Sequence, residues 1–314
     1  MELYLGIDTS CYTTSIAAVA EGQLFFDFRL PLRVPAGQRG LRQAEMVFQH
    51  VKNLQEIAEK MSEPLANHRI VAVAASTRPR PVTGSYMPVF EVARMAGLML
   101  AAASSVPFYS VSHQEGHLRA GLWSAGDPEV ERFLAVHISG GTTEILAVER
   151  KKTGMEIKII GGSNDLHAGQ FVDRVGVALG LPFPAGPSLE KLAAEWTEEE
   201  PELPVAVKGM EISFSGPESQ ARRWIEQGYP PAAVARAVEK CIAASLTRVL
   251  RRALQNGYPQ QILLVGGVAA NTYLRGYLQE KLAREGAILH FAAPAYSTDN
   301  AVGVAFLAFD RMRG

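Results

Sequence analysis

The chain has 314 residues, of which 47% are hydrophobic and 20% are charged, and its formal net charge at pH 7 is −1. This composition is typical of a globular protein with one large domain or two ordinary ones. It excludes a general polyanion binder, so any contact with nucleic acid needs a local patch or a partner. The two cysteines, Cys11 and Cys241, give no disulfide framework and no metal-binding pair, so we expect a reducing cytoplasm. The chain begins without a basic leader and no apolar run reaches membrane-spanning length, so we expect no membrane partner.

The first half of the chain alternates predicted strands and helices. Apolar runs predict strands at residues 3–8, 16–20, 70–75 and 107–111, and periodic patterns predict helices at 44–61 and 87–104. A hydroxyl-rich turn at 9–15 separates the first two strands. Strands that alternate with helices indicate an α/β fold, with a mixed or parallel sheet covered on both faces.

The stretch Ser112-His113-Gln114-Glu115-Gly116-His117 carries two histidines four residues apart. In a helix these side chains lie one turn apart on one face, so both imidazoles can reach one metal ion. Ser112 is a suitable helix N-cap. A helix with two solvated histidines is the alternative, because two ligands are too few for a metal site and a third has to come from elsewhere.

A peptidase is not expected from this stretch. In zinc peptidases of the His-Glu-x-x-His type, the residue after the first histidine is the general base. Here that residue is Gln114, which cannot accept a proton. Glu115 lies about 200° around the helix from His113, at 3.6 residues per turn, and therefore points away from a metal held by the histidines.

The second half of the chain opens with a hairpin like the one at the start. Strands are predicted at 133–138 and 145–148, and between them lies the hydroxyl-rich turn Ser139-Gly140-Gly141-Thr142. Such a tip lets backbone N–H groups approach a phosphate, although a single one is usually only a turn. Two such hairpins, each heading a half-chain, indicate an internal duplication. We place a first lobe at 1–126 and a second at 127–299, with a C-terminal helix at 300–314 that can pack back on the first.

The rest of the second half contains a second glycine-rich turn. Helices are predicted at 173–181, 188–196, 231–256, 272–284 and 301–313, and a solvated acidic loop at 197–204. An apolar strand at 262–265 leads into Gly266-Gly267-Val268-Ala269-Ala270-Asn271, which opens a helix. This pattern can bind a nucleotide or phosphate, although a tight strand–helix turn needs the glycines anyway. Asp299 begins the last helix, where a carboxylate is most often stabilised by the helix dipole alone.

These pieces, in this order, resemble the tRNA threonylcarbamoyladenosine transferases, a family once described as O-sialoglycoprotein endopeptidases. The resemblance covers nearly the whole chain, and His113-x-Glu115-Gly116-His117 is its most specific part. The other motifs that carry it are Ser139-Gly140-Gly141, Ser213-Phe214-Ser215-Gly216, Gly266-Gly267-Val268-x-Ala270-Asn271 and Thr298-Asp299-Asn300. The resemblance implies an actin-like ATPase (ASKHA) fold, with duplicated ribonuclease-H-like lobes and a cleft between them.

The resemblance also implies roles for matching residues. His113, His117 and Asp299 would hold one divalent metal, usually iron or zinc. An ATP- or AMP-type nucleotide, or threonylcarbamoyl-adenylate as the substrate, would be bound by residues of the glycine-rich turns and two flanking positions: Ser139, Gly140, Gly141, Thr142, Asp173, Gly186, Gly267 and Asn271. The family activity is transfer of the threonylcarbamoyl group to the adenine amine next to a tRNA anticodon. Family members also assemble with a related, metal-free paralogue.

Several positions depart from the family pattern. Acidic or acid-like residues, a histidine and a lysine of the family are replaced here by Tyr12 and Thr13, Thr142, Leu166, Gln170 and Glu218. Such changes alter the electric field where charge develops during the transfer. The chain therefore resembles a divergent paralogue. We expect a metal-dependent transferase that acts on an adenylate; the alternative is a catalytically weak paralogue that binds nucleotide and partners as a scaffold.

Overall fold

The computed structural model describes residues 1–10, 12–34, 41–151 and 154–313. Cys11 lies outside the described residues. The chain forms two compact units, the first with residues 1–128, 150–156 and 298–314, and the second with residues 129–149 and 157–297. The lobe boundaries proposed from the sequence stay a prediction, but Asp299, which they assign to the second lobe, groups here with the first unit.

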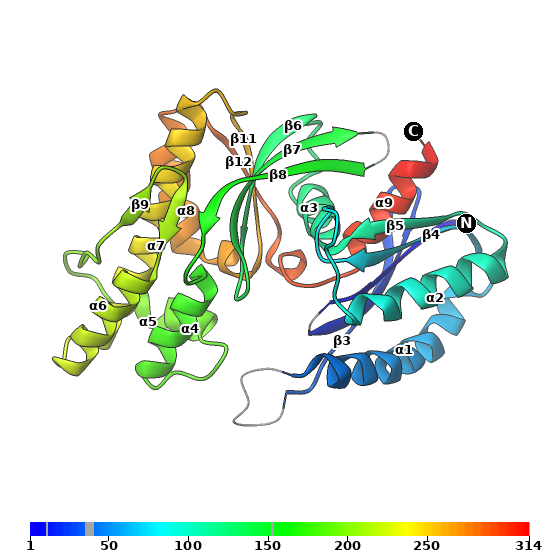
Figure 1. The fold of residues 1–314 in the computed structure, drawn as a ribbon, viewed down its shortest axis with the longest axis horizontal. Helices are drawn as coiled ribbons and strands as arrows, with labels where there is room; N and C mark the ends of the chain where they lie inside the picture. The colour runs from blue at the N-terminus through cyan, green and yellow to red at the C-terminus, as the bar shows by residue number, and fades with distance from the viewer. Residues whose placement is uncertain (11, 35–40, 152–153, 314) are drawn as a thin grey trace. The chain divides into compact units, whose positions relative to one another are not determined.

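A five-stranded sheet organises the first unit (Figure 1). Its strands, in the order β3-β2-β1-β4-β5 across the sheet, have these bounds: β1 (Glu2–Thr9), β2 (Thr13–Ala20), β3 (Gln23–Pro31), β4 (Arg69–Arg78) and β5 (Phe108–Ser112). The first three are antiparallel neighbours, whereas β4 and β5 run parallel to β1. Because parallel strands end at one edge of a sheet, the polar residues Asp8, Ser76 and Ser112 come together there.

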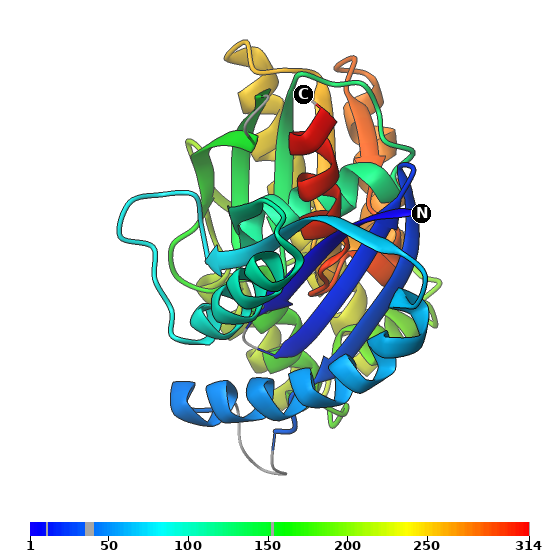
Figure 2. The ribbon, with the colours of Figure 1, turned by 90° about the vertical axis from the view of Figure 1, so that its right-hand side faces the viewer.

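Helices cover both faces of this sheet. Side chains alternate between the two faces of a strand, and Leu5 and Ile7 pack with Ile57 of α1 (Gln43–Leu65) and Ala93 of α2 (Val89–Ser104). Gly6, between them, faces the backbone of Ala305 in α9. Helix α9 (Val302–Arg313) therefore covers the opposite face, where it packs beside α3 (His113–Ser124) (Figure 2).

The second unit repeats this strand plan. Its seven strands are β6 (Arg132–Ile138), β7 (Thr143–Lys151), β8 (Gly154–Ser163), β9 (Ala206–Lys208), β10 (Glu211–Ser213), β11 (Gln261–Val265) and β12 (Ile288–Phe291). The order β8-β7-β6-β11-β12 within this sheet matches β3-β2-β1-β4-β5 of the first. In both, the hairpin partner is antiparallel and the later strands are parallel to the first. The predicted internal duplication is confirmed.

Helices on one face of the second sheet form the core of the second unit. They are α4 (Ala168–Ala178), α5 (Gly186–Ala193), α6 (Ser215–Glu226), α7 (Pro231–Gln255) and α8 (Thr272–Ala283), with short 3-10 turns at Gly267–Ala270 and Pro294–Tyr296. Alternate residues of β6, Leu134, Val136 and Ile138, pack against Phe171 of α4 and Leu246 of α7. The α/β class predicted from the alternation of strands and helices is confirmed.

Several elements were not predicted from the sequence. They are β3, β8, β9, β10, β12 and α6, and α4 begins at Ala168 rather than at residue 173. In β3 the charged residues Asp27 and Arg29 interrupt the apolar residues, and β9 and β10 have only three residues each. The segment 197–204 has no helix or strand, as expected of a loop.

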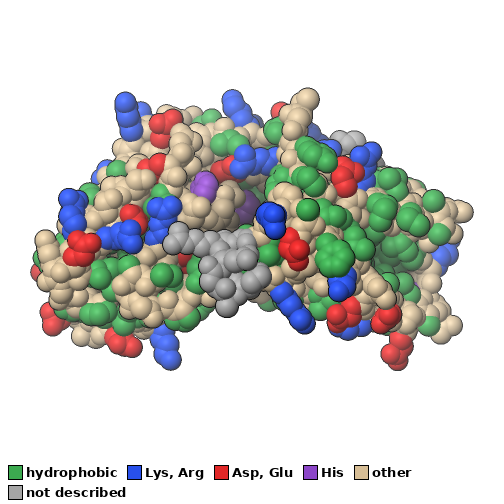
Figure 3. Space-filling model, turned by 60° about the horizontal axis from the view of Figure 1, so that its bottom comes forward, with side chains coloured by type: hydrophobic (Ala, Val, Ile, Leu, Met, Phe, Trp, Pro, Cys, Tyr) green, Lys and Arg blue, Asp and Glu red, His purple; other side chains and the backbone are tan. Residues whose placement is uncertain are grey.

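The described surface carries charges of both signs. Lysine, arginine and acidic side chains are scattered over the face in Figure 3, in keeping with the net charge of −1. Among the described residues, no helix is both long enough and apolar enough to cross a membrane.

Candidate functional site

The start of α3 is closed by reciprocal hydrogen bonds. The backbone N–H of Glu115 donates to Ser112 Oγ at 3.2 Å, and the backbone N–H of Ser112 donates to Glu115 Oε2 at 2.7 Å. This capping box makes His113 the first residue of the helix. The predicted N-cap is confirmed. The carboxylate of Glu115 bonds Ser112 at the start of the helix.

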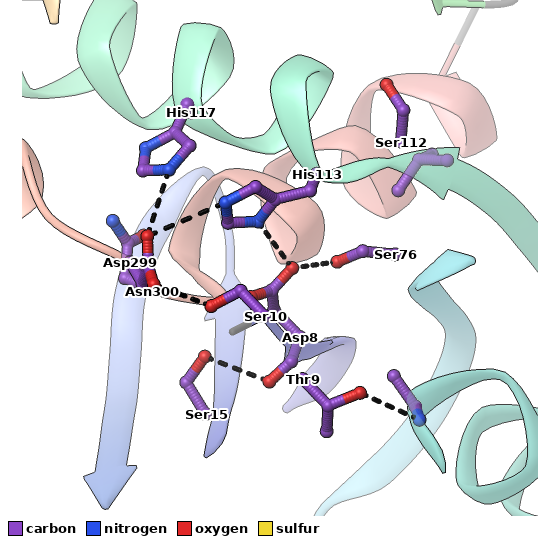
Figure 4. A network of polar contacts seen from close by, with 12 residues as sticks. Asp8, Thr9, Ser10, Ser15, Ser76, Ser112, His113, His117, Asp299 and Asn300 are labelled. Atoms are coloured by element: carbon purple, nitrogen blue, oxygen red, sulfur yellow. Dashed lines mark hydrogen bonds and ion pairs between the residues drawn. The ribbon is translucent and has the colours of Figure 1, made fainter. Parts of the chain in front are cut away.

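Three side chains of the first unit converge on one point (Figure 4). His117 Nε2 lies 3.2 Å, and His113 Nε2 3.5 Å, from the same oxygen of Asp299, Oδ1. One ligand atom of each residue lies within 4.8 Å of those of the other two. Donor atoms that share a metal at about 2 Å stand roughly 3 Å apart, so this spacing suits shared coordination. The structure thus brings together the three residues that the family resemblance had grouped.

Neighbouring polar groups hold two of these side chains. His113 Nδ1 lies 2.9 Å from Asp8 Oδ1, and that oxygen also accepts a hydrogen bond from Ser76 Oγ. Ser10 Oγ donates to Asp299 Oδ2 at 2.7 Å. The end of strand β1 therefore contacts both a histidine and the carboxylate of the triad.

The charges of the triad stabilise one another. Burial alone would lower the pKa of His113, but the carboxylates of Asp8 and Asp299 outweigh it and raise that pKa well above 6.5. Burial opposes the ionisation of Asp299, yet its hydrogen bonds to His113 and His117 keep its pKa well below 3.8. Because a ligating histidine must lose its proton, a metal would compete with protons for His113.

Helix packing brings Asp299 to the histidines. Asn300 Oδ1 accepts a hydrogen bond from Val302 N at 3.0 Å, and so closes the start of α9 directly after Asp299. Arg119 of α3, which is only 3% exposed, bonds Asp310 of α9 through Nε at 2.7 Å. An ion pair thus joins α3, which carries the two histidines, to α9, which follows Asp299.

The first glycine-rich turn lies against α4 in the second unit. Gly169 N donates to Ser139 O at 3.1 Å, and Ala168 N donates to Thr143 Oγ1 at 2.8 Å. A β-carbon at Gly169 would stand 2.6 Å from Gly140 N, so only glycine permits this approach. The turn at Ser139–Thr142 and the N-terminus of α4 therefore lie together, and the first two N–H groups of α4 donate to Thr143 and Ser139.

The second glycine-rich turn lies beside the first. A β-carbon at Gly266 would stand 2.2 Å from the carbonyl oxygen of Ile138, the residue that precedes Ser139. Gly267 follows at the start of the 3-10 turn, exposed to solvent. The ends of β6 and β11 thus bring the two turns to one edge of the sheet.

Hydrogen bonds hold the surroundings of Asp173, Gly186 and Asn271 in the second unit. Asp173 accepts a hydrogen bond from the N–H of Ala185, next to Gly186, at 2.7 Å. One turn further along α5, Glu190 accepts from the backbone N–H of Thr272 at 2.7 Å. Asn271 itself caps α8 through Leu274 N and donates to Glu239 at 2.6 Å.

Two residues with strong contacts to these sites were not predicted from the sequence. Asp8 is a carboxylate near the end of the mostly apolar strand β1, and a charge in such a strand is a signal that could have identified it. Glu239 interrupts the apolar stripe of α7, where it bonds Asn271 and, at 2.7 Å, Arg236. Burial raises the pKa of Glu239 to about 7, against the effects of Asn271 and Arg236.

Some residues that replace family positions have structural contacts. Leu166 is 2% exposed and packs in the core of the second unit. Gln170 Oε1 accepts from His167 N at 3.2 Å at the start of α4. Glu218 is buried at the start of α6, and Tyr12 is 42% exposed. Leu166 and Gln170 therefore contribute to packing and helix capping.

The duplicated sheets and their strand order define an actin-like ATPase fold. Solved structures similar to this chain include HypF of T. kodakarensis (TM-score 0.63, 13% identity, all of this chain and 48% of that one). The activator of 2-hydroxyisocaproyl-CoA dehydratase of Clostridium difficile is also similar (TM-score 0.54, 13% identity, 99% of this chain and 96% of that one). So is the ROK hexokinase of Thermus thermophilus (TM-score 0.51, 17% identity, 98% of each chain). At these identities the likeness establishes the fold alone.

Sequence relatives establish the family. The model of the family described as tRNA N6-adenosine threonylcarbamoyltransferase (TsaD) matches residues 44–306. A protein of that name from Thermus thermophilus is 33% identical over 98% of this chain and 92% of its own length. Another, from Thermococcus sibiricus, is 32% identical over 96% of this chain and 89% of its own. The chain belongs to the tRNA N6-adenosine threonylcarbamoyltransferase family, whose members are transferases.

Proposed function

We propose that the protein is a metal-dependent transferase that binds an adenylate and transfers its threonylcarbamoyl group, or a related carbamoyl group, to the adenine amine next to a tRNA anticodon. The observation that carries the proposal is the meeting of His113, His117 and Asp299 around one point, with ligand atoms within 4.8 Å of one another. Membership of the family supplies the substrate class.

The donor set fits a divalent metal, iron or zinc. Two imidazole nitrogens face one carboxylate oxygen, and such a set leaves coordination positions open for a further ligand. When bound, the metal would supply positive charge to substrate oxygens as charge develops on them. The first unit's own residues orient the donors, because Ser10 holds Asp299 and Asp8 contacts the far nitrogen of His113.

The two glycine-rich turns support nucleotide binding in the second unit. In the turn Ser139–Thr142, the backbone N–H groups of Gly140 and Thr142 would bind phosphate, since those of Ser139 and Gly141 donate within the turn. Gly267 and Asn271 would lie against the adenosine, and Asp173 and Gly186 would flank the ribose. The carbamoyl group of an adenylate is already activated, because the attacking amine displaces AMP, a good leaving group. These residues would therefore mainly position the substrate, and the chemistry demands no strong general base.

A catalytically weak paralogue that binds nucleotide and acts as a scaffold is the second candidate. The observation that favours it is that two residues at changed family positions have structural contacts: Leu166 packs in the core, and Gln170 accepts a hydrogen bond at the start of α4. Removing one well-placed transition-state donor can cost about 100- to 1000-fold in rate. We therefore expect this chain alone to transfer poorly. A related metal-free paralogue would then be the partner, in the cytoplasm.

The test mixes the purified chain with threonylcarbamoyl-adenylate and tRNA, and analyses the nucleosides by mass spectrometry. The Thermus thermophilus relative serves as the positive control. Slow transfer that disappears in His117→Ala supports the first candidate, a metal-dependent transferase. Nucleotide binding without transfer, either by the chain alone or with the metal-free paralogue added, supports the scaffold. Turnover equal to that of the relative would contradict the expectation that the replaced residues impair the transfer.

A further inference from the structure

We infer that Asp8 is a positioning residue for the metal site, because it holds the imidazole of His113 in the orientation and tautomer that leave Nε2 available as a ligand. The inference rests on the proposed metal site and assigns a role to a residue outside the three ligand candidates. It concerns the affinity for the metal rather than the transfer itself.

The contacts of Asp8 point to this role. Asp8 is fully buried at the end of β1, and its Oδ1 lies 2.9 Å from His113 Nδ1. A carboxylate can only accept hydrogen bonds, so Nδ1 of His113 must be the donor. A neutral imidazole carries one proton, and Nε2 is then left with its lone pair. That nitrogen is the one that faces Asp299.

A second neighbour holds the carboxylate in place. Ser76 Oγ, from the end of the adjacent strand β4, donates to the same oxygen of Asp8. Ser10, two residues after Asp8, donates to Asp299. The ends of two adjoining strands therefore orient a histidine and the carboxylate of the proposed site together (Figure 4).

The other oxygen of Asp8 argues against a role in stability alone. Among the residues that the structure describes, Oδ2 of Asp8 is buried without a hydrogen-bond partner. A buried acceptor without a partner is unfavourable for folding. A side chain present only to stabilise the fold would be better as a neutral one. The unfavourable burial of Oδ2 is explained if the carboxylate of Asp8 acts on His113, since a carboxylate bonded to a ligating histidine raises the basicity of that histidine.

Asp8→Asn tests the inference with little change of volume. The amide has no negative charge, and it can turn its NH₂ group toward His113 and so reverse the tautomer. We expect zinc affinity to fall about 10- to 100-fold, the range usual for such partners of ligating histidines. Ser76→Ala should give a smaller loss. Asp27→Asn is the matched control, because Asp27 lies on β3 of the same sheet and pairs with Arg29.

The measurement is competition for Zn²⁺ between the full chain and a chromophoric chelator, with the visible spectrum of the Co²⁺ form as a second readout. Thermal unfolding of each metal-free variant reports the fold. The inference predicts weaker zinc binding and an altered cobalt spectrum in Asp8→Asn, with unfolding temperature near that of the wild type. Wild-type affinity and spectrum in Asp8→Asn would overturn it and leave the metal site standing. If the wild type bound no stoichiometric zinc, the proposed metal site and this inference would both fall.

Discussion

Gly303 of α9 lies directly against the backbone of Gly116 in α3: a β-carbon at residue 303 would stand 1.9 Å from the carbonyl oxygen of Gly116. Gly116 immediately precedes His117, and Gly303 lies four residues after Asp299. The close approach of two helices, permitted by these glycines, therefore sets the distance between the histidines and the carboxylate.

Gly303→Ala should push α9 away from α3. Overpacking of this kind typically costs about 1–3 kcal/mol of stability, and the separation of Asp299 from the histidines should weaken zinc binding. Urea unfolding and zinc titration measure the two effects. Gly276→Ala in α8 is the control, because a β-carbon there meets nothing within 4 Å and alanine favours a helix by up to about 1 kcal/mol. Unchanged stability and zinc affinity in Gly303→Ala would contradict this account of the spacing.

His117→Ala should abolish stoichiometric metal. Its imidazole is 6% exposed and its Nε2 lies 3.2 Å from Asp299 Oδ1, so the substitution removes one of the three converging donors from a buried position. Elemental analysis of protein purified with added zinc measures the metal directly. His290→Ala, in strand β12 of the second unit, should keep it. One zinc per chain in both variants would mean that the metal binds elsewhere.

Asn271→Ala should weaken the binding of ATP and AMP. The side chain caps α8 and bonds Glu239, so its loss removes the proposed adenosine contact and also loosens the turn that carries Gly267. Loss of a cap costs about 1 kcal/mol of stability. Calorimetry measures the affinity, and Asn256→Ala, at the exposed end of α7, is the control. Equal nucleotide affinity in wild type and Asn271→Ala would exclude a role of this residue in binding.

Glu239 should make stability depend on pH. Its pKa is raised by burial to about 7 from 4.5, so the folded protein retains a proton that the unfolded chain has lost. The stabilising effect is complete below about pH 4.5 and is lost as pH rises through 7. At 1.36 kcal/mol per pKa unit, the loss is about 3 kcal/mol.

Glu239→Gln, which cannot titrate, isolates this effect. Urea unfolding between pH 4 and 8 should show the wild type losing about 3 kcal/mol relative to Glu239→Gln. Glu226→Gln, at an exposed position of α6, should follow the wild type. Parallel pH profiles for wild type and Glu239→Gln would show that Arg236 keeps the carboxylate ionised throughout.

The sequence predicted features that depend on local spacing. The four-residue separation of His113 and His117 and the cap at Ser112 follow from helix geometry, and the repeated hairpins indicated the duplication. Asp299 could be joined to the histidines only through family resemblance, because its approach depends on the packing of α9 at Gly303. Asp8 and Glu239 were missed because the site residues that they contact, His113 and Asn271, are distant in the chain. The half-buried strand β3 was missed because Asp27 and Arg29 interrupt its apolar residues.

Anomalous diffraction from crystals of the wild-type protein grown with zinc locates the bound metal directly. We expect one strong peak per chain at the zinc edge, about 2 Å from Nε2 of His113, Nε2 of His117 and a carboxylate oxygen of Asp299. A peak at other residues, or none at these three in zinc-loaded crystals, would contradict the proposed metal site.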